Sequence, residues 1–248
     1  MTFKLTLFTL LAGFALFASA ADIDHPAEKR HFNLPPSADL SYSIKAQQSG
    51  LQLSGNALLR WSADGNKFRI DTETRAVLIG KIDDAKTEGT IDEYGLAPVS
   101  FTEKRFRKDA TTTSFDHVGK QITFSTNSDS YPIIGGEQDR NSAIWQLVAI
   151  ARGSHGRFRP NSVWQFFVAG PRDAERWTFK VSKQEDIRTP MGTMSTVHVI
   201  KLAPDGKGQQ VDIWLAPSLE WYPVRLRYVE PNGDFIEQQI DNVSKSAG

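Results

Sequence analysis

An alternation of apolar and polar residues with a period of two constrains the fold of this chain more than any other feature. The alternation begins at Asp39 with Leu40, Tyr42, Ile44 and Ala46, and it recurs through most of the sequence. A period of two places one face of a strand in a core and the other in solvent, as in antiparallel sheets. Residue pairs suited to tight hairpin turns separate the runs at 64–65, 119–120, 205–206 and 232–233. The pattern therefore predicts an antiparallel, mainly β protein.

About a dozen strands of modest length are expected from this pattern. Two dipeptides, Gly170-Pro171 and Thr189-Pro190, are predicted to form corners rather than domain linkers. Open sheets of this size usually curl or close, because that protects their edges. The expected strand ranges are 40–46, 51–53, 57–61, 68–74, 76–82, 99–107, 114–118, 121–125, 163–169, 176–181, 193–202, 211–215, 224–229 and 235–243.

One segment, Asp139–Arg152, has the period of a helix instead. Asp139 is a suitable N-cap, and Gly153 is a suitable residue just beyond the C-terminus. An apolar arc of about 160° needs a concave surface to cover it. We therefore predict a strongly curved antiparallel sheet, a half-barrel or closed barrel, that wraps one amphipathic helix. The apolar arc consists of Ala143, Ile144, Leu147, Val148, Ile150 and Ala151.

The first twenty residues indicate export. Lys4 precedes an apolar run from Leu5 to Phe17, and Ala18-Ser19-Ala20 is typical of a signal-peptide cleavage site. The run is short for a bilayer span, which takes ~20 apolar residues, so cleavage is expected rather than a retained anchor. We predict a cleaved signal peptide over 1–20, an extended N-terminal lead-in over 21–37 and a single β-rich domain over 38–248. No transmembrane segment is expected in the mature chain.

Composition narrows the class of protein further. The sequence contains no cysteine, so lipid attachment at a cysteine, disulfides and thiol chemistry are excluded. Its 29 basic and 29 acidic residues lack the basic excess of a nucleic-acid-binding protein. An outer-membrane barrel is the competing fold, but Lys104, Arg105 and Arg107 on one predicted strand suit water better than lipid. A soluble periplasmic protein of a Gram-negative bacterium fits best.

Motifs for catalysis or metal binding are missing from the sequence. The five histidines do not form an H-E-x-x-H spacing, and no G-x-S-x-G pattern is present. We therefore predict no catalytic residues, no metal site and no cofactor.

A succession of short motifs resembles the DUF3108 family of exported bacterial proteins, whose function is undefined. The motifs are Leu96–Val99, Gln138–Arg140, Thr189–Gly192, Asp212–Pro217 and Tyr222–Leu226. The family brings no established catalytic residues. The C-terminal motifs are also similar to the tail of periplasmic lipoprotein carriers of the LolA/LolB type, and this similarity implies a half-barrel that cups acyl chains beneath helices.

Two groups of arginines are candidate sites. Arg140 is predicted to project into the apolar arc, where it needs a carboxylate from Glu103, Asp92, Glu93 or Asp139. It would either anchor the helix to the sheet by a salt bridge or recognise an anionic head group. The second group lies on one face of a predicted strand, which carries Glu103, Arg105 and Arg107. This face would either be solvated and form cross-strand ion pairs or, if it is concave, bind phosphate or carboxylate through the two arginines.

The aromatic residues Trp145, Trp164 and Phe166 are expected in the core, or as the lining of an apolar cavity between helix and sheet. The leading hypothesis is a non-enzymatic periplasmic protein that binds a lipid or other amphipathic molecule in that cavity, in cell-envelope maintenance. The alternative is a module for protein–protein interaction or assembly that contacts an envelope protein. Hydrolytic activity is a third hypothesis, and it requires polar side chains that converge in a cleft.

Overall fold

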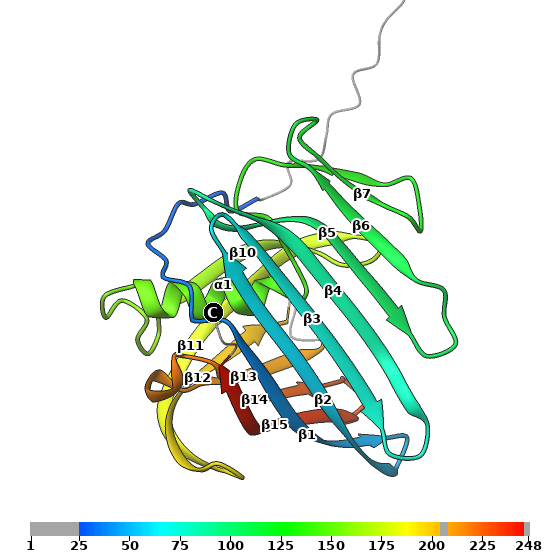
Figure 1. Ribbon diagram of the computed structural model, residues 1–248, viewed down its shortest axis with the longest axis vertical. Coiled ribbons are helices and arrows are strands. Elements are labelled where there is room, and N and C mark those ends of the chain that lie inside the picture. The colour runs from blue at the N-terminus through cyan, green and yellow to red at the C-terminus, as the bar shows by residue number, and fades with distance from the viewer. Residues whose placement is uncertain (1–24, 204–207, 246–248) are drawn as a thin grey trace, which may run out of the picture.

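A strongly curved antiparallel sheet surrounds one helix in the computed structural model, which describes residues 25–203 and 208–245 (Figure 1). The predicted fold class is confirmed, whereas the predicted signal peptide, residues 1–20, lies outside the described residues. The strands are β1 (Ala38–Gln48), β2 (Leu51–Asp64), β3 (Lys67–Ala76), β4 (Gly80–Asp92), β5 (Gly95–Arg105), β6 (Thr111–Asp116), β7 (Gln121–Phe124), β8 (Ser130–Pro132), β9 (Gln138–Asp139), β10 (Val163–Ala169), β11 (Ala174–Thr189), β12 (Gly192–Leu202), β13 (Gln210–Leu215), β14 (Pro223–Val229) and β15 (Phe235–Lys245). The helix is α1 (Ser142–Gly153), and a short 3₁₀ turn, η2 (Pro217–Leu219), precedes β14.

The strand order is a meander folded back on itself. It runs β8-β7-β6-β5-β4-β3-β2-β1-β15-β14-β13-β12-β11-β10-β9, so the first and last long strands, β1 and β15, pair at its centre. Neighbours pair antiparallel except β9 and β10, which are parallel. Register shifts interrupt several pairs, for example between Glu88 and Gly89 and between Val181 and Lys183. Such bulges bend strands and increase their twist, which supports the strong curvature.

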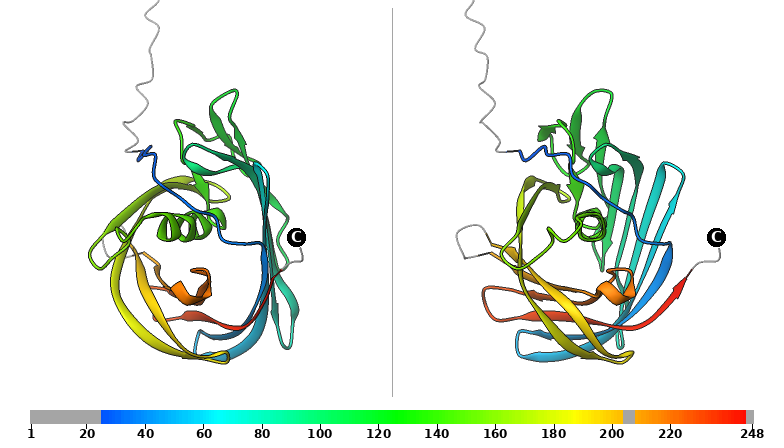
Figure 2. Two further views of the ribbon diagram at one scale, coloured as in Figure 1. Left: turned by 60° about the vertical axis from the view of Figure 1, so that its left-hand side comes forward. Right: turned by 90° about the vertical axis from the view of Figure 1, so that its left-hand side faces the viewer.

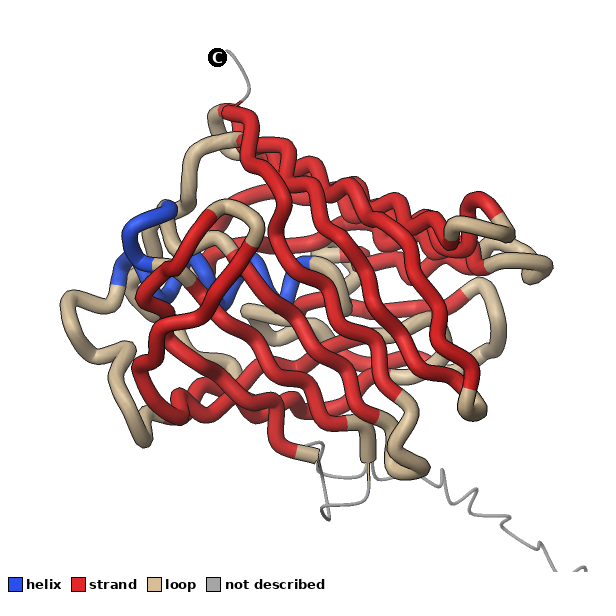
Figure 3. The backbone as a smooth tube through the Cα atoms, turned by 90° about the horizontal axis from the view of Figure 1, so that it is seen from below, coloured by secondary structure: helices blue, strands red, loops and turns tan. Residues whose placement is uncertain are grey.

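The sheet does not close through backbone pairing, and its two edge strands are β8 and β9. Side chains bridge the seam instead. The Gln138 side-chain amide donates to the Leu96 carbonyl (2.7 Å), and the Thr113 hydroxyl donates to the Gly170 carbonyl (2.8 Å). From below, the strands enclose α1 (Figure 3).

Helix α1 lies inside the curve, and ten of its twelve residues are buried. Leu147, Val148 and Ile150 pack against the inner faces of β10 to β14, as the apolar arc predicted. Trp145 stacks on Trp61 of β2, with ring centroids 4.6 Å apart. The helix begins at Ser142 with Asn141 as its N-cap, two residues after the predicted N-cap Asp139, although the Asp139 side chain still accepts hydrogen bonds from the backbone N–H groups of residues 141 and 142.

The N-terminal segment, residues 25–37, forms an extended strap across α1 (Figure 2). The Asn33 N–H donates to the Ala149 carbonyl (2.9 Å), and Trp61 and Tyr222 donate to the carbonyls of Pro35 and Pro36. A Cβ atom on Gly153 would lie 2.6 Å from the backbone of Phe32. Gly153 is thus required by the close approach of the strap, and not by a left-handed helix end.

Three strand predictions were wrong. The expected strand 76–82 is interrupted by the β3–β4 turn at residues 77–79, with residue 76 at the end of β3 and residues 80–82 at the start of β4. Strand β4 continues to Asp92, through charged sequence that held little apolar signal. The ranges 51–53 and 57–61 form one long strand, β2. The strand predicted to reach Arg107 ends at Arg105, because Arg107 adopts a positive φ of 57° in a turn.

Candidate functional site

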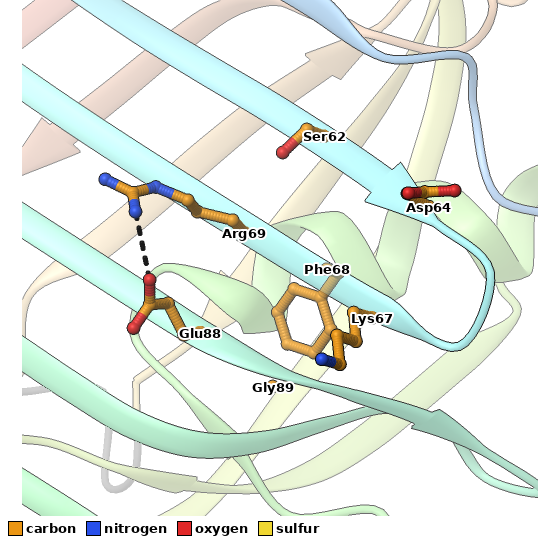
Figure 4. Close-up of a pocket in the computed structure, with 7 residues that line it drawn as sticks. All are labelled: Ser62, Asp64, Lys67, Phe68, Arg69, Glu88 and Gly89. Atoms are coloured by element: carbon orange, nitrogen blue, oxygen red, sulfur yellow. Dashed lines mark hydrogen bonds and ion pairs between the residues drawn. The ribbon is translucent and has the colours of Figure 1, made fainter.

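One hollow lies on strands β2, β3 and β4 and is open to solvent (Figure 4). It measures about 370 Å³, and two of its charged groups already have partners: Arg69 bonds Glu88 at 3.0 Å and also pairs with Asp71. A ligand would gain little enclosure there. The hollow is lined by Ser62, Asp64, Lys67, Phe68, Arg69, Glu88 and Gly89.

A second, more enclosed cavity of about 70 Å³ lies between the N-terminal end of α1 and the inner face of the sheet. Its apolar lining comes from Leu59, Ile70, Ile144, Trp145, Pro223 and Leu226, and its polar lining from Thr72, Arg140, Asn141, Tyr228 and Gln238. Because the two kinds of residue surround one space, this inner cavity can contact both ends of a small amphipathic group. We regard it as the candidate site.

Asn141 supplies an unused donor at the inner cavity. Its side-chain nitrogen is buried and has no hydrogen-bond partner within residues 25–203 and 208–245. A buried donor without an acceptor costs about 1–3 kcal/mol. A ligand oxygen or a water molecule would remove that cost.

Tyr228 makes the sheet side of the inner cavity electrostatically unusual. Burial raises the pKa of Tyr228 to about 12, and the nearby Asp83 carboxylate adds to the shift. Burial, together with the negative charge of Glu103, raises the pKa of Asp83 to about 6. Both shifts favour the neutral forms, so Tyr228 presents a neutral phenol to the cavity, and Asp83 lies near Tyr228 but outside the cavity lining.

Asp139 is fully buried beside the cavity-lining Asn141, but its hydrogen bonds serve the fold. Its Oδ1 accepts from the Thr87 hydroxyl (2.8 Å) and from the N–H groups of residues 141 and 142 (2.8 and 3.0 Å). Burial raises its pKa to about 6. The carboxylate therefore joins the start of α1 to β4.

Arg140 lies at the cavity but not where the sequence predicted. It precedes the helix, is exposed, and packs its guanidinium against Gly170. The expected salt bridge to Glu103, Asp92, Glu93 or Asp139 was wrong as far as the described residues extend, since Arg140 precedes the helix and the helical projection into the apolar arc does not apply to it. Burial lowers the pKa of Lys201 on β12, and the positive charge of Arg140 lowers it further. Two cations thus lie near each other inside the curve.

The other predicted site residues are separated. Trp145 lines the inner cavity. Trp164 and Phe166 pack in the core beneath β10, with Phe158 and Phe179 as neighbours and Arg30 of the strap within 5.7 Å of both rings. Arg105 pairs with Glu103 of the same strand, so the predicted cross-strand pairing was wrong, and Arg107 lies in the following turn over the Phe106 ring.

Sequence reasoning missed Asn141, Tyr228, Gln238 and Asp83. Tyr228 could have been found, because it alternates with Val224 and Leu226 on the inner face of a predicted strand. Asp83 had no such signal, because β4 was not predicted.

Comparison with known families gives one match along most of the chain. A sequence model described as "Protein of unknown function (DUF3108)" matches residues 41–241, as the motif succession predicted. No curated protein matches the chain.

A solved structure of low sequence identity shares the fold, and two others align with lower scores. A β-barrel-like DUF1849 protein from Brucella abortus aligns with a TM-score of 0.55 and 12% identity, over 87% of this chain and 100% of that one. A protein described as exported, with a YmcC-like fold, from Bacteroides fragilis has a TM-score of 0.37 and 8% identity, over 88% and 100%. A DUF1329 protein from Desulfovibrio piger has a TM-score of 0.34 and 8% identity, over 86% and 87%. Within the described residues, no helix has the length and hydropathy to cross a membrane.

Proposed function

The chain belongs to the DUF3108 family of unknown function, and from this premise we propose that it is a non-enzymatic periplasmic protein that binds an amphipathic molecule in the inner cavity. The observation that carries the proposal is the mixed lining of that cavity. Asn141 offers a buried donor without a partner, while Leu59, Ile70 and Ile144 offer apolar contact. Arg140 is exposed at the same cavity, so an anionic group fits beside it.

The size of the cavity limits what enters it. Pockets for drug-sized ligands measure ~300–1,000 Å³, whereas the inner cavity measures about 70 Å³. It therefore suits one end of a ligand, and a whole acyl chain would require α1 to move. Such a movement would have to release the strap and the bonds of Gln146 to β5, because both hold the helix in place.

Two further features support the periplasmic and non-enzymatic parts of the proposal. Residues 1–20 have the features of a signal peptide, and a cysteine-free chain has no lipid anchor at cysteine. Asp139, one of two carboxyl groups with a pKa raised to about 6, uses its Oδ1 to hold the helix start. A structural task of this kind accounts for a shifted pKa without catalysis.

The competing proposal, an assembly module that binds an envelope protein by strand addition, has less support. The exposed edge strand β8 is three residues long and ends in Pro132. Short edge strands that contain proline resist pairing with another chain.

Native mass spectrometry of protein purified gently from periplasm tests the proposal. A co-purifying small molecule is expected on the wild type. It should be lost from Ile144→Trp, which fills the cavity, and weakened in Tyr228→Phe, which removes only a hydroxyl. Val118→Trp, on an exposed turn, is the matched control and should retain the ligand. An unliganded mass for every preparation, without a shift after lipids are added, would contradict the proposal.

A further inference from the structure

A row of exposed apolar side chains follows one rim of the sheet, where neighbouring hairpins end. The row passes from Ile236 on β15 to Leu51 on β2, Val77, Leu78 and Ile79 between β3 and β4, and Phe106 after β5. Backbone hydrogen bonds hold the turns beside one another: Val77 N–H donates to the Ser54 carbonyl (3.0 Å), and Phe106 N–H donates to the Ile82 carbonyl (2.8 Å). In Figure 1 these hairpins lie together at the lower right.

The β3–β4 turn is the most unusual member of the rim. Three apolar residues occupy consecutive turn positions, and Leu78 is 93% exposed. Turns are normally built from glycine, proline, asparagine, aspartate and serine, because these residues favour turn geometry or solvent. Gly80, with φ of 85°, meets the backbone requirement here, so Leu78 is not needed for the turn itself. An exposed cluster of this kind points to an interaction surface.

The shape of the rim favours a soft apolar partner over a protein. Hairpins two strands apart are separated by about 10 Å, since neighbouring strands lie ~4.8 Å apart. Apolar tips at this spacing offer separate contacts rather than one continuous face to a partner protein. Neither of the two cavities described above includes any of the exposed rim residues.

Cations accompany the apolar tips. Lys104, Arg107 and Lys108 surround Phe106, and none of the three makes an ion pair with a residue that the structure describes. The Arg107 guanidinium lies 4.9 Å from the Phe106 ring centroid. Unpaired basic residues beside apolar side chains suit the interface of a membrane, where the cations contact anionic head groups and the apolar groups enter the acyl boundary.

We propose that this rim docks the protein on the surface of a lipid bilayer that contains anionic head groups. The tips of the β3–β4 and β5–β6 hairpins enter the interface, and Arg107 and Lys108 contact the head groups. The proposal is independent of the inner cavity, because the two sets of residues do not overlap.

Flotation of the full mature chain with vesicles of phosphatidylethanolamine and phosphatidylglycerol tests the docking. Leu78→Asp should lower the partition coefficient at least about ten-fold, because a largely exposed leucine no longer enters the apolar layer. Val118→Asp is the matched control: Val118 is 95% exposed in the β6–β7 turn at the far end of the sheet, and its change should leave binding unaltered. The double change Arg107→Ser, Lys108→Ser should lower the affinity for the vesicles and make that affinity less dependent on salt. Lys120→Ser, in the β6–β7 turn, should change neither the affinity nor its salt dependence.

Several results would overturn the docking. The first is that the wild type does not bind vesicles, and the second is that Leu78→Asp and Val118→Asp lower vesicle binding equally. The third is that the wild type does not bind vesicles but forms a dimer, which Leu78→Asp dissociates. The last result would assign the rim to a second copy of the chain. If Leu78→Asp unfolds, Leu78→Trp gives a second measurement, because its emission should shift to the blue with vesicles while that of Val118→Trp stays unchanged. Ile144→Trp should retain vesicle binding, which separates this proposal from the one on the inner cavity.

Discussion

Gln146 gives the sharpest test of how α1 is held in the curve. Its side chain is 3% exposed and reaches the start of β5, where its carbonyl accepts from the Leu96 N–H (2.8 Å) and its amide donates to the Tyr94 carbonyl (2.7 Å). The side-chain amide thus makes the two hydrogen bonds that the backbone of a neighbouring strand would make. Gly95 lies between the two backbone groups, and a Cβ atom there would be 2.4 Å from the amide.

Replacing Gln146 by leucine should destabilise the protein by about 1.5–4.5 kcal/mol. The Leu96 N–H is buried and loses its acceptor, which costs about 1–3 kcal/mol, and the partly accessible Tyr94 carbonyl loses about 0.5–1.5 kcal/mol because water can replace the donor in part. For a domain of this size the melting temperature falls by about 2–4 °C per kcal/mol. Urea and thermal unfolding measure the loss, and amide exchange should accelerate at Leu96.

Gln184→Leu is the matched control, because Gln184 is exposed on β11. Its effect should stay within about 0.5 kcal/mol. Gln146→Glu provides a further check: it keeps the acceptor and loses the donor, so its deficit should shrink at acidic pH, where a protonated carboxyl can donate again. Equal stabilities for Gln146→Leu and Gln184→Leu would refute the account of the helix anchor.

Three further changes test the buried carboxylate, the strap and its anchor. Burial raises the pKa of Asp139 from 3.8 to about 6. Between pH 3.8 and about 6 the folded state therefore binds a proton that the unfolded state has lost, and the wild type loses stability as the pH rises through this range. Asp139→Asn keeps the acceptor oxygen, so in urea unfolding it should be more stable than the wild type by up to about 3 kcal/mol above this pH range and equally stable below it. Gly153→Ala should cost about 1–3 kcal/mol, since its Cβ would overlap the Phe32 backbone, while Gly208→Ala should be neutral in the same assay. Tyr222→Phe loses the 2.7 Å bond to the Pro36 carbonyl, so limited proteolysis should cut residues 25–37 faster than in Tyr131→Phe, and equal rates would contradict this role.

The strands with a clear period of two were the most predictable part of the fold. The range 163–169 matches β10 residue for residue, and Trp164, Phe166 and Val168 share the face toward the core. In contrast, β4 escaped prediction because its sequence is mostly polar and is stabilised by pairing on both sides with β3 and β5. The apolar run at 77–79 was assigned to a strand for the opposite reason: period and hydropathy cannot distinguish an exposed apolar turn from a buried strand.

The candidate site depended on residues distant in the chain, and the sequence could place only some of them. Trp145, expected in the core or at a space between helix and sheet, is buried and lines the inner cavity. Arg140 was misplaced because the helix begins only at Ser142, so Arg140 precedes it and does not follow the 100° per residue of the helix. Asn141 and Tyr228 meet at the inner cavity only because α1 lies across β14, a contact that no local pattern encodes.

By itself, the sequence determined the antiparallel strands, the single amphipathic helix and the family to which the chain belongs, because periodicity, turn residues and motif order are properties of neighbouring residues. Tertiary structure decided how the sheet curls, where its seam lies and which polar groups are buried. Gln146 pairs with Tyr94 and Leu96, and Tyr222 with Pro36, across 50 or more residues. Such contacts form only when the whole sheet packs around the helix. Packing excludes water, so each buried backbone donor or acceptor must then pair with a group that the fold has brought close to it.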